Sequence, residues 1–324
     1  MGLAAPFDSQ SNALLAETVS ARKHAAADDS STFEVGEVIG GRYRVLGVLG
    51  RGGMGEVFEA EHLELRAKVA IKVLRMPRGR LAAEQLSREA RITASLATEN
   101  VVRVSDCGTL MDGSPYVVME RLYGTDLQGL LAEKRRLPVQ LALRIALEIC
   151  RGLEDLHAAQ IIHRDIKPAN VFVLSPKGLN RCRCKILDLG ISSYSSHHTP
   201  SPLLTPGSLR FMAPEQLTDP ASVTDLADIY AVGVVLYRCL TGSVPHDGES
   251  GEEIALSILN RGARPVAQLR PEVSPALSAL VMQTIARPME SRPKSARALA
   301  RSLRSLLRPA RTLQPHSTSR VLTP

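Results

Sequence analysis

Aromatic residues are scarce in this chain of 324 residues, where they make up 3% and include no tryptophan. The apolar fraction is nevertheless 44%, which is usual for a globular protein, so the core must consist mainly of Leu, Val, Ile and Ala. The chain is long enough for one large domain or for two lobes with a sizeable buried core.

Cysteines are also few, and their pattern excludes a disulfide framework. There are five, an odd number without the spacing of metal ligands, and the closest pair, Cys182 and Cys184, lies in the run "RCRCK". Such usage favours reduced thiols in a cytoplasmic protein over a redox or metal role.

Long apolar runs are missing as well. The longest, "IYAVGVVLY" at residues 229–237, falls far short of the roughly 20 residues that a membrane-spanning helix needs. The N-terminus has neither the basic start nor the apolar stretch of a signal peptide. We therefore expect a cytoplasmic protein with no membrane segment.

Positive charge is concentrated near the C-terminus. The net charge is +7, but the segment from Arg287 onward holds nine Lys or Arg and a single acid, Glu290. This segment therefore carries +8 and the rest of the chain −1. Nucleic-acid binding by the main body is not expected, because its charge is nearly balanced.

The order of local patterns suggests two lobes. Residues 1–40 are rich in Ala, Ser and Asp and are expected to form a flexible leader. From Tyr43, short Val-rich runs separated by Gly or charged turns predict antiparallel strands, interrupted by a helical pattern around residues 83–97. After Leu122 helical patterns dominate, which predicts a small β-rich lobe followed by a larger α-rich lobe.

A glycine-rich run, "LGRGGMGEVFEA", is the first sign of phosphate chemistry. Gly50, Gly52 and Gly55 leave backbone amides accessible because no Cβ covers them. A dinucleotide-binding fold would place a helix directly after the glycines, whereas the following residues have the pattern of a strand. The run is therefore either a plain glycine hairpin or a flap over a nucleotide.

Lys72 ends the apolar run "VAIK", fifteen residues after Val57 at the end of the glycine-rich pattern. Such a lysine is commonly an exposed residue at a strand end, but here it could reach nucleotide phosphates. It would then need an anion to orient its ammonium group, and Glu89 on the next predicted helix is the candidate.

Two later runs, "HRDIKPAN" and "KILDLG", hold side chains suited to phosphoryl transfer. Asp165 could accept a proton from a hydroxyl group, and Lys167 could neutralise charge on a transferring phosphoryl group. Asn170 and Asp188 carry the oxygen ligands that Mg²⁺ prefers. Taken alone, each run could equally be a polar turn.

Together with "FMAPEQ", these runs resemble the ordered signature of protein kinases over about residues 43–306. The wording "GGMGEVFEA", "HRDIKPAN" and "MAPEQL" most resembles bacterial, eukaryotic-like serine/threonine protein kinases. The resemblance implies a two-lobed α+β protein-kinase fold in residues 41–308. Its N-lobe would span about 41–121 and its C-lobe about 122–308, followed by a disordered basic tail, 309–324.

The resemblance also implies roles for individual residues. Asp165 would be the catalytic base, assisted by Lys167, Lys72 and Glu89, while Asn170 and Asp188 would hold Mg²⁺, which Mn²⁺ could replace. Glu215 would pair with Arg292 and Asp228 would brace the catalytic-loop backbone, both as structural roles. Ser208 would bond Asp165 and Lys167, where related kinases use Thr. ATP would be bound by Leu49, Gly50, Gly52, Gly55, Val57, Ala70, Lys72, Met119, Glu120, Leu122 and Asp126.

Regulation would act on the segment between Asp188 and Ala213. In this family the Arg before the base, here Arg164, often binds a phosphate on that segment, where Thr199, Ser201 and Thr205 each precede a proline. We expect autophosphorylation at one or more of these three, with self-association for the reaction in trans. An unmodified, solvated loop is the alternative.

Three functions compete on the sequence alone. The first is an ATP-dependent kinase that transfers the γ-phosphoryl group to Ser or Thr of protein substrates; the resemblance implies this acceptor class, because Ser/Thr kinases carry a lysine two residues after the base, as Lys167 does here. The second is a catalytically silent pseudokinase or scaffold, and the third is a small-molecule kinase of related fold. The basic run at 294–308 is either the last helix of the large lobe or a docking surface for an acidic partner or membrane.

Overall fold

The structure, a computed structural model, describes residues 31–52, 55–74, 90, 93–94, 96, 98–174, 182–188 and 206–307. The chain forms two compact units, which are treated separately below. The first comprises Met1–Glu133 with Pro168–Pro202, and the second comprises Lys134–Lys167 with Leu203–Pro324.

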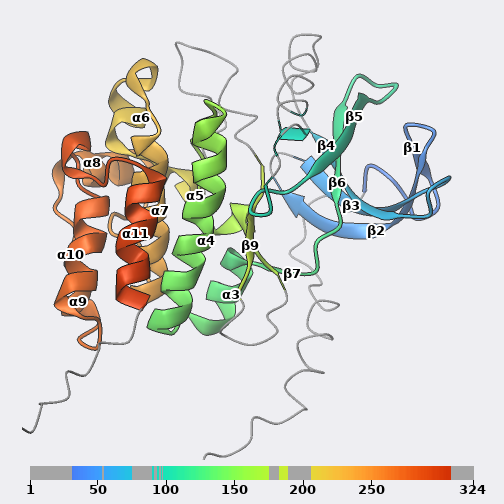
Figure 1. Cartoon of the computed structure of the whole chain (residues 1–324). Coiled ribbons are helices and arrows are strands. Elements are labelled where there is room, and N and C mark those ends of the chain that lie inside the picture. Colours follow the sequence, from blue (N-terminus) through green and yellow to red (C-terminus); the bar gives the residue numbers. More distant parts are fainter. Residues whose placement is uncertain are drawn as a thin grey trace, which may run out of the picture. The chain divides into compact units, whose positions relative to one another are not determined.

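An antiparallel sheet of six strands, in the order β1-β2-β3-β4-β6-β5, forms most of the first unit (Figure 1). Burial alternates at the start of β2 and along β3, as in a sheet with one covered face, whereas five consecutive residues of β4 and four of β6 are buried. The strands are β1 (Val38–Ile39), β2 (Tyr43–Gly52), β3 (Gly55–His62), β4 (Lys68–Leu74), β5 (Val104–Thr109) and β6 (Pro115–Glu120).

One face of this sheet carries the apolar core of the unit. Its buried residues come from five strands and are Ile39, Tyr43, Val45, Phe58, Ala60, Ile71, Val73, Tyr116 and Val118. The side chains of the intervening residues point to the opposite face. Lys72, between Ile71 and Val73, therefore lies on the face away from this core.

A second, three-stranded sheet belongs to the same unit. It consists of β7 (Gly124–Asp126), β8 (Val171–Leu174) and β9 (Cys184–Ile186), with the short helix η1 (Pro168–Asn170) before β8. The Ile186 N–H donates to the Asn100 carbonyl at 2.8 Å, and the Val102 N–H donates to the Ile186 carbonyl at 2.9 Å. These bonds fix the strand that leads into Asp188. Helix α3 (Leu127–Lys134) begins directly after β7.

The second unit is helical. Helix α7 is buried along almost its whole length, which explains the uninterrupted apolar run "IYAVGVVLY". Its neighbours include α4, α9 and α10, and α4 also packs against α11. The helices are α4 (Val139–Ala158), α5 (Pro206–Leu209), α6 (Pro214–Thr218), η3 (Pro220–Ser222), α7 (Leu226–Thr241), α8 (Gly251–Asn260), α9 (Val266–Leu269), α10 (Pro275–Thr284), η4 (Met289–Ser291) and α11 (Ala296–Leu307).

The predicted C-terminal helix corresponds to α11. Leu299 and Leu303 are buried, whereas Arg297, Arg301 and Arg304 are exposed, so the apolar stripe and the basic face lie where the spacing put them. The helix packs its apolar side on α4, as expected for the last helix of a lobe.

Residues 31–40 differ from the expected flexible leader. Phe33 packs against the core of the six-stranded sheet, and Val38–Ile39 form its edge strand. The preceding residues 1–30 and the tail from 308 onward are not among the described ones. None of the helices described combines the length and apolar character that crossing a bilayer requires.

Candidate active site

The register of the large sheet gathers the predicted nucleotide-binding residues on one face. Gly50 lies opposite Val57, Val57 opposite Lys72, and Ala70 opposite Met119. Residues paired across antiparallel strands point to the same side of a sheet. These five residues therefore line the face opposite the apolar core.

Glycine is suited to the three positions of the hairpin for different physical reasons. A Cβ at Gly50 or Gly52 would meet no atom within 4 Å, so these positions leave the backbone open. Gly55 has φ +143°, and a Cβ there would lie 2.0 Å from the Val73 carbonyl oxygen, so it excludes any side chain. Gly53 and Met54, at the tip, are outside the residues described.

Lys72 forms an ion pair with Asp188. Its ammonium nitrogen lies 2.7 Å from the Asp188 carboxylate, and the Lys72 side chain is only 10% exposed. Asp188 adopts φ +48°, an uncommon conformation for a non-glycine residue that the surrounding structure must hold in place. The predicted partner, Glu89, is not among the residues the structure describes, so that pair stays a prediction.

The two predicted metal ligands are joined through the backbone. The N–H of Leu187, the residue before Asp188, donates to the Asn170 carbonyl at 2.8 Å. Strands β8 and β9, which pair directly, begin and end next to these residues. The arrangement fixes an amide and a carboxylate in the same unit. Their oxygens suit Mg²⁺, which usually takes few protein ligands and completes its shell with phosphate oxygens and water.

The segment after β6 shows contacts that the sequence did not predict. The Glu120 carboxylate accepts from Lys185 Nζ at 2.6 Å and from the Arg103 N–H at 2.8 Å. Arg121 contacts the Leu122 carbonyl and stacks over the Tyr123 ring at 4.7 Å. Glu120 therefore has a structural role beside its predicted backbone contact with adenine.

Asp126 also has a role that spacing alone did not reveal. Its Oδ1 accepts the N–H of Gly129 at 2.6 Å, which caps the first turn of α3. Substitution of Asp126 would therefore disturb a helix start. The predicted contact with the ribose stays a prediction.

In the second unit, three side chains form a chain of polar contacts. Lys167 Nζ lies 2.7 Å from Asp165 Oδ2 and donates to Ser208 Oγ at 2.7 Å. Asp165 and Lys167 are 14% and 17% exposed, so both remain accessible. A carboxylate that could accept a proton thus lies next to a fixed positive charge.

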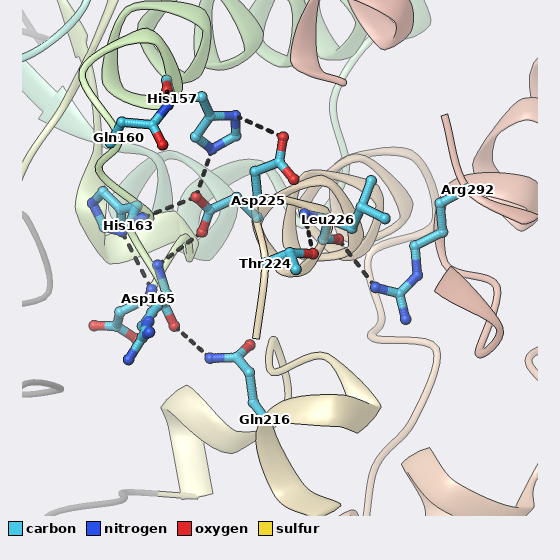
Figure 2. Close-up of polar contacts among 11 residues, drawn as sticks. His157, Gln160, His163, Asp165, Gln216, Thr224, Asp225, Leu226 and Arg292 are labelled. Carbon is cyan, nitrogen blue, oxygen red and sulfur yellow. Dashed lines mark hydrogen bonds and ion pairs between the residues drawn. The ribbon is translucent and has the colours of Figure 1, made fainter. Parts of the chain in front are cut away.

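The backbone of this loop is held by the buried Asp228 (Figure 2). Its carboxylate accepts the N–H of His163 at 2.9 Å, the N–H of Arg164 at 2.8 Å and a bond from His157 Nε2 at 2.8 Å. Bonds to a charged acceptor are stronger than neutral ones. They orient Arg164, whose φ is +64°, just before the candidate base Asp165.

Gln216 joins a second segment to the same loop. Its Nε2 donates to the Arg164 carbonyl at 2.9 Å (Figure 2). Its Oε1 accepts the Ala213 N–H at 2.9 Å. Sequence reasoning missed both Gln216 and His157. The only signal in the sequence was the position of each residue: Gln216 directly follows "APE", and His157 lies at the end of a helical pattern.

Glu215 and Arg292 form the ion pair that the sequence predicted. Two guanidinium nitrogens lie 2.6 and 2.9 Å from the two carboxylate oxygens, and Arg292 also donates to three backbone carbonyls. Its side chain is 0% exposed and stacks over the Tyr230 ring at 4.9 Å. The pair therefore anchors the "APE" segment inside the helical unit.

The structure describes only one of the four predicted regulatory residues. Arg164 is described, and its backbone is fixed as above, whereas Thr199, Ser201 and Thr205 fall in residues 189–205, which the structure does not describe. The phosphate contact of Arg164 and the modification of the three hydroxyls stay predictions.

Comparison with known families decides the assignment. The model of the protein kinase domain matches residues 43–303. The chain belongs to the protein kinase family. The expected two-lobed fold, with a β-rich N-lobe and a helical C-lobe, is confirmed by this match and by solved structures. One is the kinase domain of PknI from Mycobacterium tuberculosis, with a TM-score of 0.66 and 25% identity, covering 85% of this chain and 99% of that one.

The curated relatives of this kinase chain are bacterial, as expected. It is 33% identical to serine/threonine-protein kinase pkn3 of Myxococcus xanthus, over 84% of this chain and 51% of pkn3. It is 35% identical to PrkC of Bacillus subtilis, over 78% of this chain and 38% of PrkC. The predicted membership of the bacterial eukaryotic-like serine/threonine kinases is confirmed. The chain spans about half or less of the length of these relatives.

Proposed function

We propose that the chain is an ATP-dependent serine/threonine protein kinase. The observation that carries this proposal is the series of contacts from Asp165 to Lys167 to Ser208. The loop that bears Asp165 and Lys167 is held by backbone N–H groups that donate to the Asp228 carboxylate. A proton acceptor, a cation and an orienting hydroxyl in this order suit the transfer of a phosphoryl group to an alcohol. Membership of the kinase family and the names of the relatives support it.

The proposed roles divide between the two units. In the first, the open glycines and the face formed by Val57, Ala70 and Met119 would receive the nucleotide. Leu49 and backbone groups of Glu120 and Leu122 would complete its binding. Lys72 would contact the α- and β-phosphates and would itself be oriented by an acid, Asp188 or Glu89.

In the second unit, Asp165 would accept the proton from the Ser or Thr hydroxyl of the substrate. The acceptor oxygen then forms a bond to the γ-phosphorus while the bond to the bridging oxygen of ADP breaks. Lys167 would stabilise the negative charge that is spread over the transferred group. Its position two residues after Asp165 favours Ser and Thr over Tyr as acceptors.

We also propose Mg²⁺ at Asn170 and Asp188, with Mn²⁺ as a possible substitute. The donor set fits, because both side chains offer oxygen and both residues lie next to the paired strands β8 and β9. The chemistry supplied by the bound ion is neutralisation of charge on the phosphate oxygens.

Substrates and regulation complete the proposal. The substrates would be cytoplasmic proteins and would include the chain itself, at Thr199, Ser201 or Thr205, through association of two copies. Phosphate there would pair with Arg164. Peptide mass analysis after incubation with ATP should detect added phosphate on these residues. Full activity without any modification would contradict the regulatory part.

Transfer of label from γ-labelled ATP tests the kinase activity itself. The full chain, with Mg²⁺ and a mixture of Ser-, Thr- and Tyr-containing peptides, should label Ser or Thr, and Asp165→Asn should abolish the transfer. Asp155→Asn, an exposed acid on α4, is the matched control and should retain it. Equal background signals from wild type and Asp165→Asn would favour the scaffold alternative.

A further inference from the structure

The buried acid Glu56 lies at the base of the glycine hairpin and outside the face proposed to bind nucleotide. It follows Gly55 on β3, and its side chain is 1% exposed. Because Glu56 and Phe58 are two residues apart on one strand, the carboxylate points to the face of the apolar core, opposite Val57 and Lys72. It cannot act by touching the nucleotide from there.

One ion pair and one hydrogen bond reach this carboxylate from different segments. Arg51, its direct partner across the hairpin, places Nε 3.1 Å from Oε1. The backbone N–H of Thr32 donates to Oε2 at 2.8 Å. Burying a carboxylate costs free energy unless positive charge and hydrogen bonds compensate it. The ion pair with Arg51 and the hydrogen bond from Thr32 therefore both contribute to keeping the hairpin in place.

Thr32 belongs to a segment that precedes the region matched to the kinase family. We call residues Ser31–Gly36 the N-terminal arm. The ring of Phe33 meets the ring of Phe58 edge to face, with centroids 5.7 Å apart, and the N–H of Gly36 donates to the Val45 carbonyl at 2.9 Å. The arm is thus attached to both strands of the hairpin, although the family match begins only at residue 43.

The hairpin needs such an attachment because its own residues supply little rigidity. Gly50, Gly52 and Gly55 have more backbone freedom than other residues, and Gly50 and Gly52 have no neighbour that would meet a side chain. The position of its amides therefore depends on what fixes Arg51 and Glu56. The arm provides one of those fixed points.

We propose that the N-terminal arm and Glu56 position the glycine hairpin for ATP, with Thr32 N–H to Glu56 as the contact that joins them. Glu56 is a positioning residue, since it acts through the hairpin. The inference rests on the proposed kinase function, which makes the hairpin an ATP site. Loss of the contact should weaken ATP binding and leave the chemical step almost unchanged.

The experiment uses full-length point variants. Thr32→Pro removes the N–H donor, and Thr32→Ala keeps it and serves as the matched control. Glu56→Met replaces the acceptor by an apolar side chain of similar length. We expect the KM for ATP to rise about three- to tenfold in Thr32→Pro and Glu56→Met, the range for the net loss of one ordinary hydrogen bond, with kcat within about twofold. The double variant should be no worse than Glu56→Met alone.

Hydrogen exchange of the nucleotide-free protein supplies a readout that does not depend on activity. Amides of residues 44–58 should exchange faster in Thr32→Pro and Glu56→Met than in Thr32→Ala, while β4 and β6 keep their rates. If the chain proves not to be a kinase, the KM measurement is no longer possible. The exchange measurement still shows whether the contact between Thr32 and Glu56 holds the hairpin in place.

Two results would overturn the proposal. One is unchanged exchange and unchanged KM in both Thr32→Pro and Glu56→Met. The other is faster exchange throughout the six-stranded sheet, because the arm would then stabilise the fold as a whole rather than position the hairpin.

Discussion

In the first unit, Lys72 and Asp188 contact each other directly; Lys72 lies within the paired strand β4, and Asp188 follows two residues after the end of β9. In the second unit, Asp165 lies on a loop whose backbone N–H groups bond the buried Asp228. The first arrangement joins a lysine on a sheet strand to a carboxylate just after another strand, whereas the second fixes a loop backbone by a buried acid. The difference teaches that nucleotide binding and proton transfer depend on separate frameworks, which can be disrupted one at a time.

The largest expected effect concerns the framework of the second unit. Arg292→Ala should lower the free energy of unfolding by about 3–5 kcal/mol, because it leaves the Glu215 carboxylate buried without its cation. Urea unfolding would measure this. Arg66→Ala in the first unit, which removes an exposed pair with Glu61 at 3.5 Å, is the control and should cost no more than about 0.5 kcal/mol. Similar costs for both would mean that the second unit does not depend on its buried pair.

Loss of charge on the nucleotide side should come next. Lys72→Met should lower kcat/KM for phosphoryl transfer about 10²–10³-fold, the usual loss when one preorganised group that stabilises transferring charge is removed. Lys68→Met lies on the same strand but removes only an exposed pair with Glu59 at 3.3 Å. It should retain activity within about twofold. Equal losses in both variants would indicate damage to β4 rather than to a phosphate contact.

A buried histidine makes the second unit sensitive to acid. Burial, together with the nearby Arg287 guanidinium, lowers the pKa of His246 to about 4 from the ordinary value of 6.5. The unfolded chain therefore binds more protons between these values, and stability is fully present above pH 6.5 and falls as pH drops towards 4. We expect a loss of about 1–2 kcal/mol between pH 7 and pH 5, after allowance for solvent screening.

Urea unfolding at both pH values tests the histidine contribution. His246→Asn should be less stable at pH 7 but should lose less stability than wild type on going to pH 5. An identical pH dependence in the two proteins would show that His246 is not the group responsible.

The smallest expected effect on activity concerns the hydroxyl group of Ser208. Ser208→Ala removes the acceptor for Lys167, and kcat should fall about five- to tenfold, as expected for the net contribution of one ordinary hydrogen bond. Ser208→Thr keeps the hydroxyl and should remain within about twofold of wild type. If Thr were as damaging as Ala, steric fit rather than the hydrogen bond would explain Ser208.

Much of the site could be predicted because its residues are close in sequence or follow strand alternation. Asp165, Lys167 and Asn170 occur within one run, and Ala70 and Lys72 alternate along one strand, whereas Val57 came from the family resemblance and the strand register places it opposite Lys72. The pairing of Glu215 with Arg292 came from the family resemblance. Burial and a two-oxygen geometry give the physical reason for it.

The other contacts depend on distances that only the folded chain sets. Sequence order offered Glu89 as the partner of Lys72, but the described partner is Asp188, more than a hundred residues away. Gln216 and His157 hold the catalytic loop from other segments, and no local pattern marked them. Residues 31–40 were likewise assigned to a flexible leader from their composition. Composition carries no information on the contact between the Phe33 and Phe58 rings.

Titration of MgATP into the Asp165→Asn variant tests the central claim most directly, when combined with its transfer activity. If nucleotide binding and proton transfer rest on separate frameworks, this variant should bind MgATP within about twofold of wild type, because it keeps every group proposed to hold the nucleotide. It should nevertheless transfer no label. Loss of MgATP binding in Asp165→Asn, or transfer at the wild-type rate, would contradict the account.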